Sequence, residues 1–411
     1  MSNIDLLLKT IEEMRDEIIE ITADFVKIPN VNPPGENYPK FTDYYAKRTK
    51  ELGLEATIIE VPKERVEAMG YELPRTNALA TLRGTEGKPV LHMNGHFDVV
   101  PVGSSWTRDP FGAEIEDGKM YGRGASDMKG SIAAQLMAAA AIKRTGIKLK
   151  GTIICSATCD EETGGQLGAG YVVEKGYGDA DYGINSDSGP TDAVSLGHRG
   201  AMWMEITTKG VTAHGSVPHK GLNAVEKMAD IVKELQGLRE DFKTRVSEMP
   251  LADPLQKHPT ITIGGTIHGG LKTNVVPDRC YMTIDRRVLY EETPEEAREE
   301  IEAALRRVAE RDSELDYETK VVNRVEPCYT PESSEIVQTL KRNVKAVLGK
   351  EAKISYGGGY TDMWYFNKIM AMAHYGVNTT GQAHTADEYL DLEGLITGTK
   401  VIALTALELL S

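Results

Sequence analysis

Apolar and polar positions in the first part of the chain follow two periods. Short apolar runs typical of strands occur at 54–62, 77–84, 88–96 and 151–157. Helical spacing occurs in the Ala-rich segment 126–144 and in 166–176. The first 25 residues alternate Leu and Ile with Asp and Glu, which predicts an amphipathic helix and not a signal peptide. Strands that alternate with helices predict an α/β layout.

The pattern changes near Gly197. Strand-like runs occur at 201–215, 260–270 and 279–288, and helical spacing occurs at 223–238 and 294–312. This order predicts a separate α+β unit at 197–324. Two further helices are expected at 335–349 and 392–410. Because the last segment is short and rich in His and Asp, we infer that it rejoins the first part. The prediction is therefore one domain of residues 1–196 plus 325–411, with 197–324 inserted.

Composition and charge limit the kinds of partner and the cellular compartment that we expect for this chain. A chain of 411 residues exceeds the usual size of a single core, which agrees with two domains. No apolar run approaches the roughly 20 residues of a membrane span. Four cysteines without a CxxC pair favour reduced thiols in the cytoplasm. The net charge of -15 repels nucleic acid and anionic lipid, so a small molecule is the expected partner.

One predicted strand ends in a pattern suited to metal binding. The run 88–96 ends in His96, and Asp98 lies two residues further on the same side of an extended chain. A metal-bound imidazole usually donates its other N–H group to a carboxylate, so Asp98 would orient His96. For this pair alone, a purely structural histidine is the favoured interpretation.

Acidic residues also stand at the ends of other elements. Asp127 follows a glycine-rich loop and opens the Ala-rich segment, where a carboxylate can simply cap a helix. Glu161 and Glu162 follow the strand 151–157, at the edge where open α/β sheets place their sites. Adjacent side chains project differently, so one can reach a metal while the other faces a water molecule or a substrate. A solvated acidic turn is an equally open interpretation of this pair.

Two more candidate ligands lie later in the sequence. Asp187 ends a short strand, and His384 lies in a loop near the C-terminus; they complete a set that includes His96, Asp127 and Glu162. Two histidines and three carboxylates suit two Zn²⁺ ions about 3.5–4 Å apart with one shared carboxylate. Co²⁺ or Mn²⁺ can also occupy such mixed sites. Glu161 would then move the proton of the attacking water to the leaving nitrogen.

Ordered segments of the chain resemble one family of enzymes. The segments GHFDVVP, DEETGG, NSD, GVTAHGSVPHKGLNAV, NVVPD, IDRR and QAHTADE occur in sequence between Gly95 and Glu388. They are similar to motifs of the di-zinc hydrolases that include acetylornithine deacetylase, succinyl-diaminopimelate desuccinylase, aminoacylase and carboxypeptidase G. The resemblance implies an α/β catalytic domain with a mixed sheet. It also implies that the inserted block 197–324 is an α+β lid that often forms dimers.

The resemblance implies a role for each candidate residue. In the catalytic domain these are His96 and Asp187 on one zinc, Glu162 and His384 on the other, Asp127 bridging, Glu161 as catalytic base and Asp98 as orienter of His96. In the lid they are His214 as stabiliser of the oxyanion, frequently across a dimer interface, and Asn274 and Arg287 as substrate contacts. Thr361 lies where the family positions substrate. For Arg287, a surface charge on a strand is the alternative.

These observations lead to one main functional prediction. It is a cytoplasmic, homodimeric di-zinc amidohydrolase that cleaves an N-acyl amino acid or a similar small amide bearing a carboxylate. A carboxypeptidase or dipeptidase that uses the same site is the alternative. A non-catalytic binding protein is less favoured because Glu161 is present. Bulky residues at 364–366 predict an aromatic core beneath the Thr361 loop, with an unusual substrate pocket as the alternative.

Overall fold

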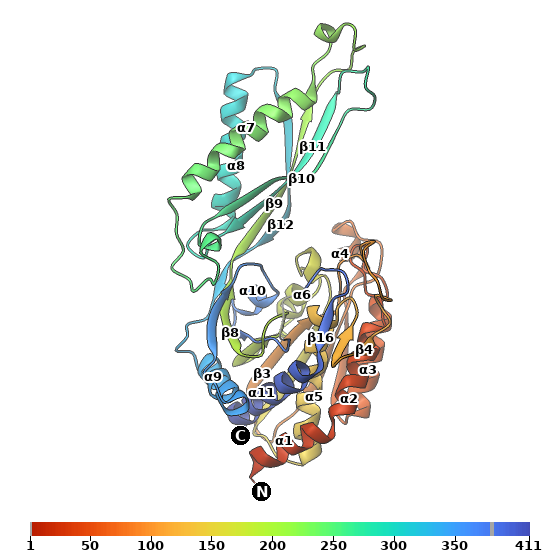
Figure 1. The fold of residues 1–411 in the computed structure, drawn as a ribbon, viewed down its shortest axis with the longest axis vertical. Coiled ribbons are helices and arrows are strands. Elements are labelled where there is room, and N and C mark those ends of the chain that lie inside the picture. The colour runs from red at the N-terminus through yellow and green to blue at the C-terminus, as the bar shows by residue number, and fades with distance from the viewer. Residues whose placement is uncertain (1, 379–381) are drawn as a thin grey trace. The chain divides into compact units, whose positions relative to one another are not determined.

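The structure is a computed structural model that describes residues 2–378 and 382–411 (Figure 1). The chain divides into two compact units. Unit 1 is made of Met1–Gly197, Thr330–Ser355 and Thr361–Ser411, and unit 2 of His198–Tyr329 and Tyr356–Tyr360. The middle of the sequence therefore forms a unit of its own, and the end of the chain returns to the first unit.

A mixed sheet forms the centre of unit 1. Within the described residues it has nine strands, in the order β1-β2-β6-β3-β7-β15-β8-β13 with β14 beside β8. Their bounds are β1 Glu55–Glu60, β2 Thr76–Leu82, β3 Gly87–His96, β6 Gly151–Thr158, β7 Tyr182–Asn185, β8 Ala193–His198, β13 Cys328–Tyr329, β14 Lys353–Gly357 and β15 Ala371–His374. The pairs β3–β6, β3–β7 and β7–β15 are parallel, whereas β1–β2, β2–β6 and β8–β15 are antiparallel. The expected α/β fold with a mixed sheet is confirmed.

Helices surround this sheet, and the most buried of them is α5. Nearly every side chain of α5 is buried, because small Ala residues let it pack closely against α1, α2 and α11. The two ends of the chain meet there, with α1 in red against α11 in blue (Figure 1). The helices of unit 1 are α1 Asn3–Glu13, α2 Arg15–Val26, α3 Tyr38–Glu51, α4 Lys63–Ala68, α5 Gly130–Thr145, α6 Ala169–Glu174, α9 Glu335–Leu348, α10 Met363–Phe366 and α11 Leu392–Leu410.

Two helix predictions differ from the structure. The N-terminal helix is broken at Met14 into α1 and α2, although neither Gly nor Pro marks the break. The helix predicted at 126–144 begins at Gly130, because Ala125–Lys129 forms an irregular turn, η1, in which Asp127 has φ -126° and ψ 90°. Asp127 therefore does not cap a regular helix. The backbone N–H groups around it donate to the Glu388 side chain instead.

Unit 2 is an antiparallel sheet covered by two helices. Its strands lie in the order β10-β11-β9-β12, with bounds β9 Gly200–Lys209, β10 Thr260–Gly269, β11 Arg279–Val288 and β12 Asp316–Val325. The helices α7 (Ala224–Phe242) and α8 (Pro294–Arg311) contact each other and β9 (Figure 1). Apolar side chains from both helices and from alternate strand positions, including Met204, Ile231 and Ile301, share one core. The two-helix, four-strand content agrees with the predicted α+β character.

A small third sheet in unit 1 matters for the site. Its strands are β4 Glu114–Glu116, β5 Lys119–Tyr121 and β16 Tyr389–Asp391, in the order β16-β5-β4. It pairs a segment near residue 120 with one near residue 390, so that the loops beyond these strands run side by side. In the part of the chain that the structure describes, no helix has the length and apolar character needed to cross a bilayer.

Candidate metal centre

Parallel strands bring the predicted site residues to one edge of the large sheet. His96 at the end of β3 is in register with Thr158 at the end of β6, and Asn94 is in register with Asn185 of β7. The residues that follow these strand ends, which include Asp98, Glu161, Glu162 and Asp187, therefore meet at the same edge.

Candidate ligand atoms form three overlapping groups at this edge. In each group the atoms lie within 4.8 Å of one another; the groups are His96, Asp127 and Asp187; His96, Glu161 and Glu162; and Asp127, Glu162 and His384. The structure thus brings together all five residues predicted as metal ligands and the predicted base. Asp127 belongs to two groups that otherwise share no residue.

The position of Asp127 agrees with a shared carboxylate. Its Oδ1 lies 3.2 Å from Nε2 of His96, and its Oδ2 lies 3.4 Å from Nε2 of His384. The same His384 nitrogen lies 3.0 Å from Oε1 of Glu162. Each oxygen of Asp127 therefore faces a different histidine, which is the arrangement that a carboxylate between two cations requires.

Asp98 lies beside His96 and also contacts the turn at Glu161. The closest acceptor for Nδ1 of His96 is the backbone carbonyl of Asp98 at 3.0 Å, and the carboxylate is further away at 3.5 Å. The carboxylate itself accepts hydrogen bonds from the backbone N–H groups of Glu161 at 3.2 Å and Glu162 at 3.3 Å. Asp98 thus connects the β3 edge to the turn that carries the predicted base.

Asp160, the first acid of DEETGG, lies in a buried cradle that sequence reasoning did not find. Its carboxylate accepts hydrogen bonds from Nε of Arg75 at 2.7 Å, the hydroxyl of Tyr38 at 2.8 Å and the amide of Asn32 at 3.3 Å. The Asn32 amide also donates to Asp98 at 2.8 Å. Arg75 and Asp160 are almost fully buried. No local pattern marks Arg75 or Asn32, because their partners are distant in sequence.

The space around Gly165 of DEETGG leaves no room for a side chain. Gly165 has φ +72°, and a Cβ atom there would lie 2.3 Å from Oδ1 of Asp362 and 3.0 Å from the Tyr365 ring. The Tyr365 hydroxyl donates to the carbonyl of Gly164 at 2.8 Å. Trp364 and Phe366 are buried. Tyr365 therefore packs against this turn, and the burial of Trp364 and Phe366 agrees with the aromatic core predicted beneath the Thr361 loop.

The electrostatics of the cluster favour a cation. Burial raises the pKa of Glu161 and Asp187 well above the usual range, and neighbouring carboxylates add to this shift. Burial also opposes ionisation of Asp127, but hydrogen bonds from His384 and His96 outweigh it and lower its pKa. Hydrogen bonds to Asp127 and Glu162 raise the pKa of His384 to about 10. The buried acids compete for the positive charge of two histidines.

This donor set fits two divalent cations. Imidazole and carboxylate donors are the usual ligands of Zn²⁺, and also suit Co²⁺ and Mn²⁺. Two cations would offset the charge of the four carboxylates that share this small volume, namely those of Asp127, Glu161, Glu162 and Asp187. The chemistry of the donors therefore agrees with a dinuclear centre.

Three predicted site residues lie in unit 2. The backbone N–H of Gly215 donates to the carbonyl of Asn274 at 2.8 Å, and His214 pairs with Val275, so His214 and Asn274 are close together. Arg287 lies on β11, where its guanidinium contacts Asp285 at 2.9 Å. Their predicted functional roles stay predictions.

Thr361 belongs to unit 1. Its hydroxyl accepts a hydrogen bond from the backbone N–H of Met363 at 3.2 Å, at the start of α10. The next residue, Asp362, is buried and accepts a hydrogen bond from Thr158 at 3.1 Å. Asp362 thus anchors the Thr361 loop to the end of β6, three residues before Glu161. The predicted contact of Thr361 with substrate stays a prediction.

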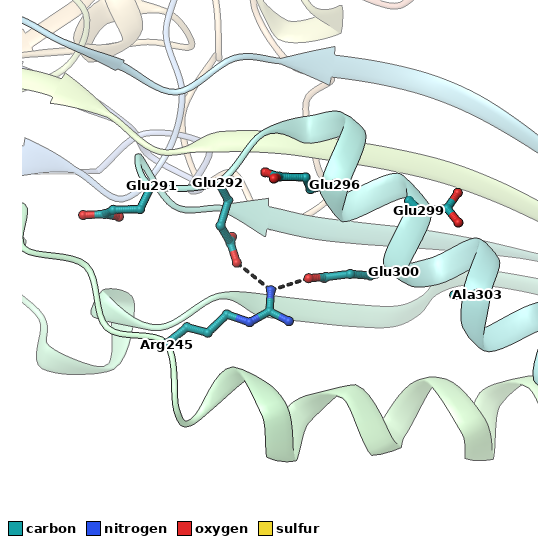
Figure 2. A pocket seen from close by; sticks show the side chains of 7 residues that line it. All are labelled: Arg245, Glu291, Glu292, Glu296, Glu299, Glu300 and Ala303. Carbon is teal, nitrogen blue, oxygen red and sulfur yellow. Dashed lines mark hydrogen bonds and ion pairs between the residues drawn. The ribbon is translucent and has the colours of Figure 1, made fainter.

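A second acidic cluster lies in unit 2, around a pocket of about 430 Å³ (Figure 2). Arg245 makes ion pairs with Glu292 at 2.8 Å and with Glu300. The buried Arg286 contacts the same two carboxylates at 3.1 Å. Other residues that line this pocket are Glu291, Glu296, Glu299 and Ala303. Because the central carboxylates already have cationic partners, this cluster joins the chain after α7 to the start of α8 and is not a second metal site.

Comparison with known protein families identifies the family of this chain. Residues 92–408 match the group described as Peptidase family M20/M25/M40. The chain belongs to this family. It is therefore an M20 metallohydrolase, and the expected resemblance to di-zinc hydrolases is confirmed at the level of the family.

Relatives of this M20 chain carry two kinds of names. A succinyl-diaminopimelate desuccinylase of Xanthomonas campestris pv. campestris is 30% identical over 405 residues, which cover 93% of this chain and 96% of the relative. The crystal structure of an M20 family metallo-carboxypeptidase from Sulfolobus solfataricus has a TM-score of 0.80 at 21% identity and covers 95% of this chain and 98% of its own. Human carnosine dipeptidase 1 has a TM-score of 0.79 at 19% identity, with coverage of 100% and 99%. The two structural likenesses show the fold.

Proposed function

We propose that this M20 chain is a di-metal amidohydrolase that cleaves the amide bond of an N-acyl amino acid or a similar small amide bearing a carboxylate. The observation that carries the proposal is the buried carboxylate of Glu161 beside two donor groups that share Asp127. The desuccinylase name of a relative over nearly the whole chain supports an acylated amino acid as the substrate class.

Each cation would have its own protein donors. His96 and Asp187 would hold one ion, Glu162 and His384 the other, and Asp127 would contact both. When bound, the two ions would lower the pKa of the attacking water and polarise the carbonyl of the amide. Zn²⁺ is the proposed metal, and Co²⁺ and Mn²⁺ suit the same donors.

Glu161 is the proposed proton carrier. Its Oε2 lies 3.9 Å from Nε2 of His96, and its backbone is fixed by the hydrogen bond to Asp98. As the residue before Glu162, it stands beside a ligand without serving as one. Its carboxylate would take a proton from the attacking water and donate that proton to the nitrogen of the leaving amine.

Residues of unit 2 would complete the reaction. The proposed roles are stabilisation of the oxyanion by His214 and contact with substrate by Asn274 and Arg287, with Thr361 of unit 1 as a further contact. An arginine suits a substrate carboxylate because its guanidinium can donate two parallel hydrogen bonds. We further propose that the protein acts as a homodimer.

The variant Glu161→Gln tests the mechanism. It should retain two metal ions, because Gln occupies the same volume and Glu161 is not a proposed ligand, while kcat falls at least 10²- to 10⁴-fold because the amide cannot carry the proton. Metal content by elemental analysis and hydrolysis rates give the two readouts. Glu162→Gln should lose an ion, and Glu174→Gln, whose side chain is 46% exposed and pairs with Arg65, should change neither readout. A Glu161→Gln protein with a normal rate would contradict the proposal.

Substrate class is tested separately, with wild-type protein loaded with each metal. Release of amine from acetyl, succinyl and formyl amino acids is compared with hydrolysis of dipeptides of matched charge. The proposal expects higher kcat/KM on acyl amino acids. Higher kcat/KM on dipeptides would instead support a carboxypeptidase or dipeptidase with the same centre.

A further inference from the structure

Glu388 is a buried carboxylate with no role in the proposed chemistry. Its side chain is fully buried, and its Oε1 accepts hydrogen bonds from three backbone N–H groups of one loop: Gly124 at 3.1 Å, Ser126 at 3.0 Å and Asp127 at 3.1 Å. This loop contains the candidate bridging ligand. A single oxygen of Glu388 therefore holds the backbone on which the carboxylate of Asp127 is mounted.

The second oxygen of Glu388 has its own partner. Oε2 accepts a hydrogen bond from Nη1 of Arg123 at 2.5 Å. The Arg123 side chain is 3% exposed, and its guanidinium lies 5.3 Å from the centre of the Trp106 ring. The carboxylate is thus paired with a cation from the same loop. Removing the charge of Glu388 alone would leave Arg123 buried without its counterion.

Backbone hydrogen bonds connect Glu388 to the loop that carries His384, a second proposed metal ligand. Strands β5 and β16 pair with Tyr121 opposite Tyr389, and one step further the N–H of Gly122 donates to the carbonyl of Glu388 at 2.9 Å. His384 lies four residues before Glu388 in the same loop. The side chain of Asp387 also accepts hydrogen bonds from Thr107, at 3.0 Å and 2.8 Å. The loop that carries His384 is therefore fastened to the loop that carries Asp127.

We propose that Glu388 is a positioning residue that sets the spacing between Asp127 and His384 and so determines the affinity for the metal ion held by Asp127, Glu162 and His384. This inference rests on the proposed di-metal function. His384 needs such support because its side chain is 52% exposed and its loop is not part of a strand. The imidazole approaches Asp127 within 3.4 Å only while both loops keep this spacing.

The test measures metal affinity and not activity. Metal-free wild-type protein, Glu388→Ala and His384→Ala are titrated with Zn²⁺ in the presence of a competing chelator, and thermal unfolding of each metal-free protein shows that it is folded. Glu388→Ala should lower the affinity for one of the two metal ions about 10- to 100-fold, as expected when a group that orients a ligand is lost. That ion should be the one lost in His384→Ala.

Two further variants separate positioning from general stability. Asp391→Ala removes a cap of α11, in which the carboxylate accepts from Gly394 at 2.8 Å, and should lower the melting temperature while both affinities stay unchanged. The double variant Glu388→Gln with Arg123→Met keeps an acceptor oxygen for the three N–H groups and leaves no unpaired charge. It should bind the second ion more tightly than Glu388→Ala does.

The outcomes are distinct. A lower affinity for one ion in Glu388→Ala, but not in Asp391→Ala, supports the positioning role. Wild-type affinity for both ions in Glu388→Ala, or an equal loss in Asp391→Ala, would overturn it and leave the proposed function intact. Wild-type protein that binds fewer than two ions would overturn the proposed function and this inference together.

Discussion

Replacing Arg75 with methionine should destabilise unit 1, because it removes the only cation that contacts Asp160 among the described residues. The guanidinium and the carboxylate are 0% and 3% exposed, with Nε of Arg75 2.7 Å from Oδ2 of Asp160. Methionine keeps an unbranched apolar side chain against the rings of Tyr38 and Tyr71, which lie 5.2 Å and 4.2 Å from the guanidinium. The change is therefore mainly one of charge and hydrogen bonding.

The magnitude follows from what remains around the carboxylate. Breaking a buried ion pair by removing one partner costs about 3–5 kcal/mol of unfolding free energy. Oδ1 of Asp160 keeps its hydrogen bonds from Tyr38 and Asn32, and only Oδ2 loses its donor. We therefore expect a loss of about 3 kcal/mol, near the lower limit. With an m-value near 3 kcal/mol/M, this lowers the midpoint of urea unfolding by about 1 M.

The pH dependence gives the same prediction a second test. Burial and the neighbouring Asp98 raise the pKa of Asp160 to about 6, although Arg75 lowers it. Without Arg75 this pKa rises further above its unfolded value of about 3.9. The folded variant then binds more protons than the unfolded chain, so its stability increases as the pH falls. The difference between wild type and Arg75→Met should shrink from pH 8 to pH 6.

A double-mutant cycle supplies the assay. Urea unfolding in the presence of a chelator is compared for wild type, Arg75→Met, Asp160→Asn and the double variant. The double variant should lose at least about 1 kcal/mol less than the sum of the single losses. Arg83→Met, which removes an exposed pair with Glu55, is the control and should leave the midpoint almost unchanged. Additive losses, or a loss that grows toward pH 6, would refute the reasoning.

Three further predictions concern other parts of unit 1. Burial lowers the pKa of His92 to about 3, whereas in the unfolded chain it lies near 6.5, so the unfolded chain binds more protons between these two values. His92 should therefore lower the free energy of unfolding by up to about 1.4 kcal/mol for each pH unit below pH 6.5. In urea titrations at several pH values, His92→Gln should remove this contribution to the slope. Gly165→Ala should lower the melting temperature, because the new Cβ would lie 2.3 Å from Asp362. Zn²⁺ at about 100 times its Kd should raise the free energy of unfolding by about 2.7 kcal/mol per ion, and a chelator should reverse this in thermal scans.

The sequence predicts the architecture best where one local pattern decides it. The apolar runs at 88–96 and 151–157 form a parallel pair of strands in which most side chains are buried on both faces. The break at Met14 has no such signal, since no residue there forbids a helix. The late start of α5 at Gly130 also has none, because the non-helical backbone of Asp127 and Met128 delays it, and the N–H groups of this turn donate to Glu388, which is distant in sequence.

The residues of the candidate site also differ in how well a local pattern predicts their positions. His96 ends a strand and Glu162 and Asp187 follow strand ends, and such ends meet at one edge of a parallel sheet, so their proximity could be predicted from the strand pattern. Asp127 and His384 lie on loops, and their proximity was expected from the chemistry of the ligand set and from family resemblance, not from any period in the sequence. The residues that hold these loops could not be predicted, because a hydrogen bond between distant residues leaves no pattern in either segment.

This division has a physical consequence for how the centre withstands substitution. Candidate ligands at strand ends are held by ladder hydrogen bonds that many residues share, so a single nearby substitution should shift them little. In the proposed assignment, candidate ligands on loops depend on a few buried carboxylates, above all Glu388, whose loss would release three backbone N–H groups at once. Substitutions of these carboxylates should therefore change metal affinity before they unfold the sheet, whereas substitutions in the sheet should reduce stability and metal binding together.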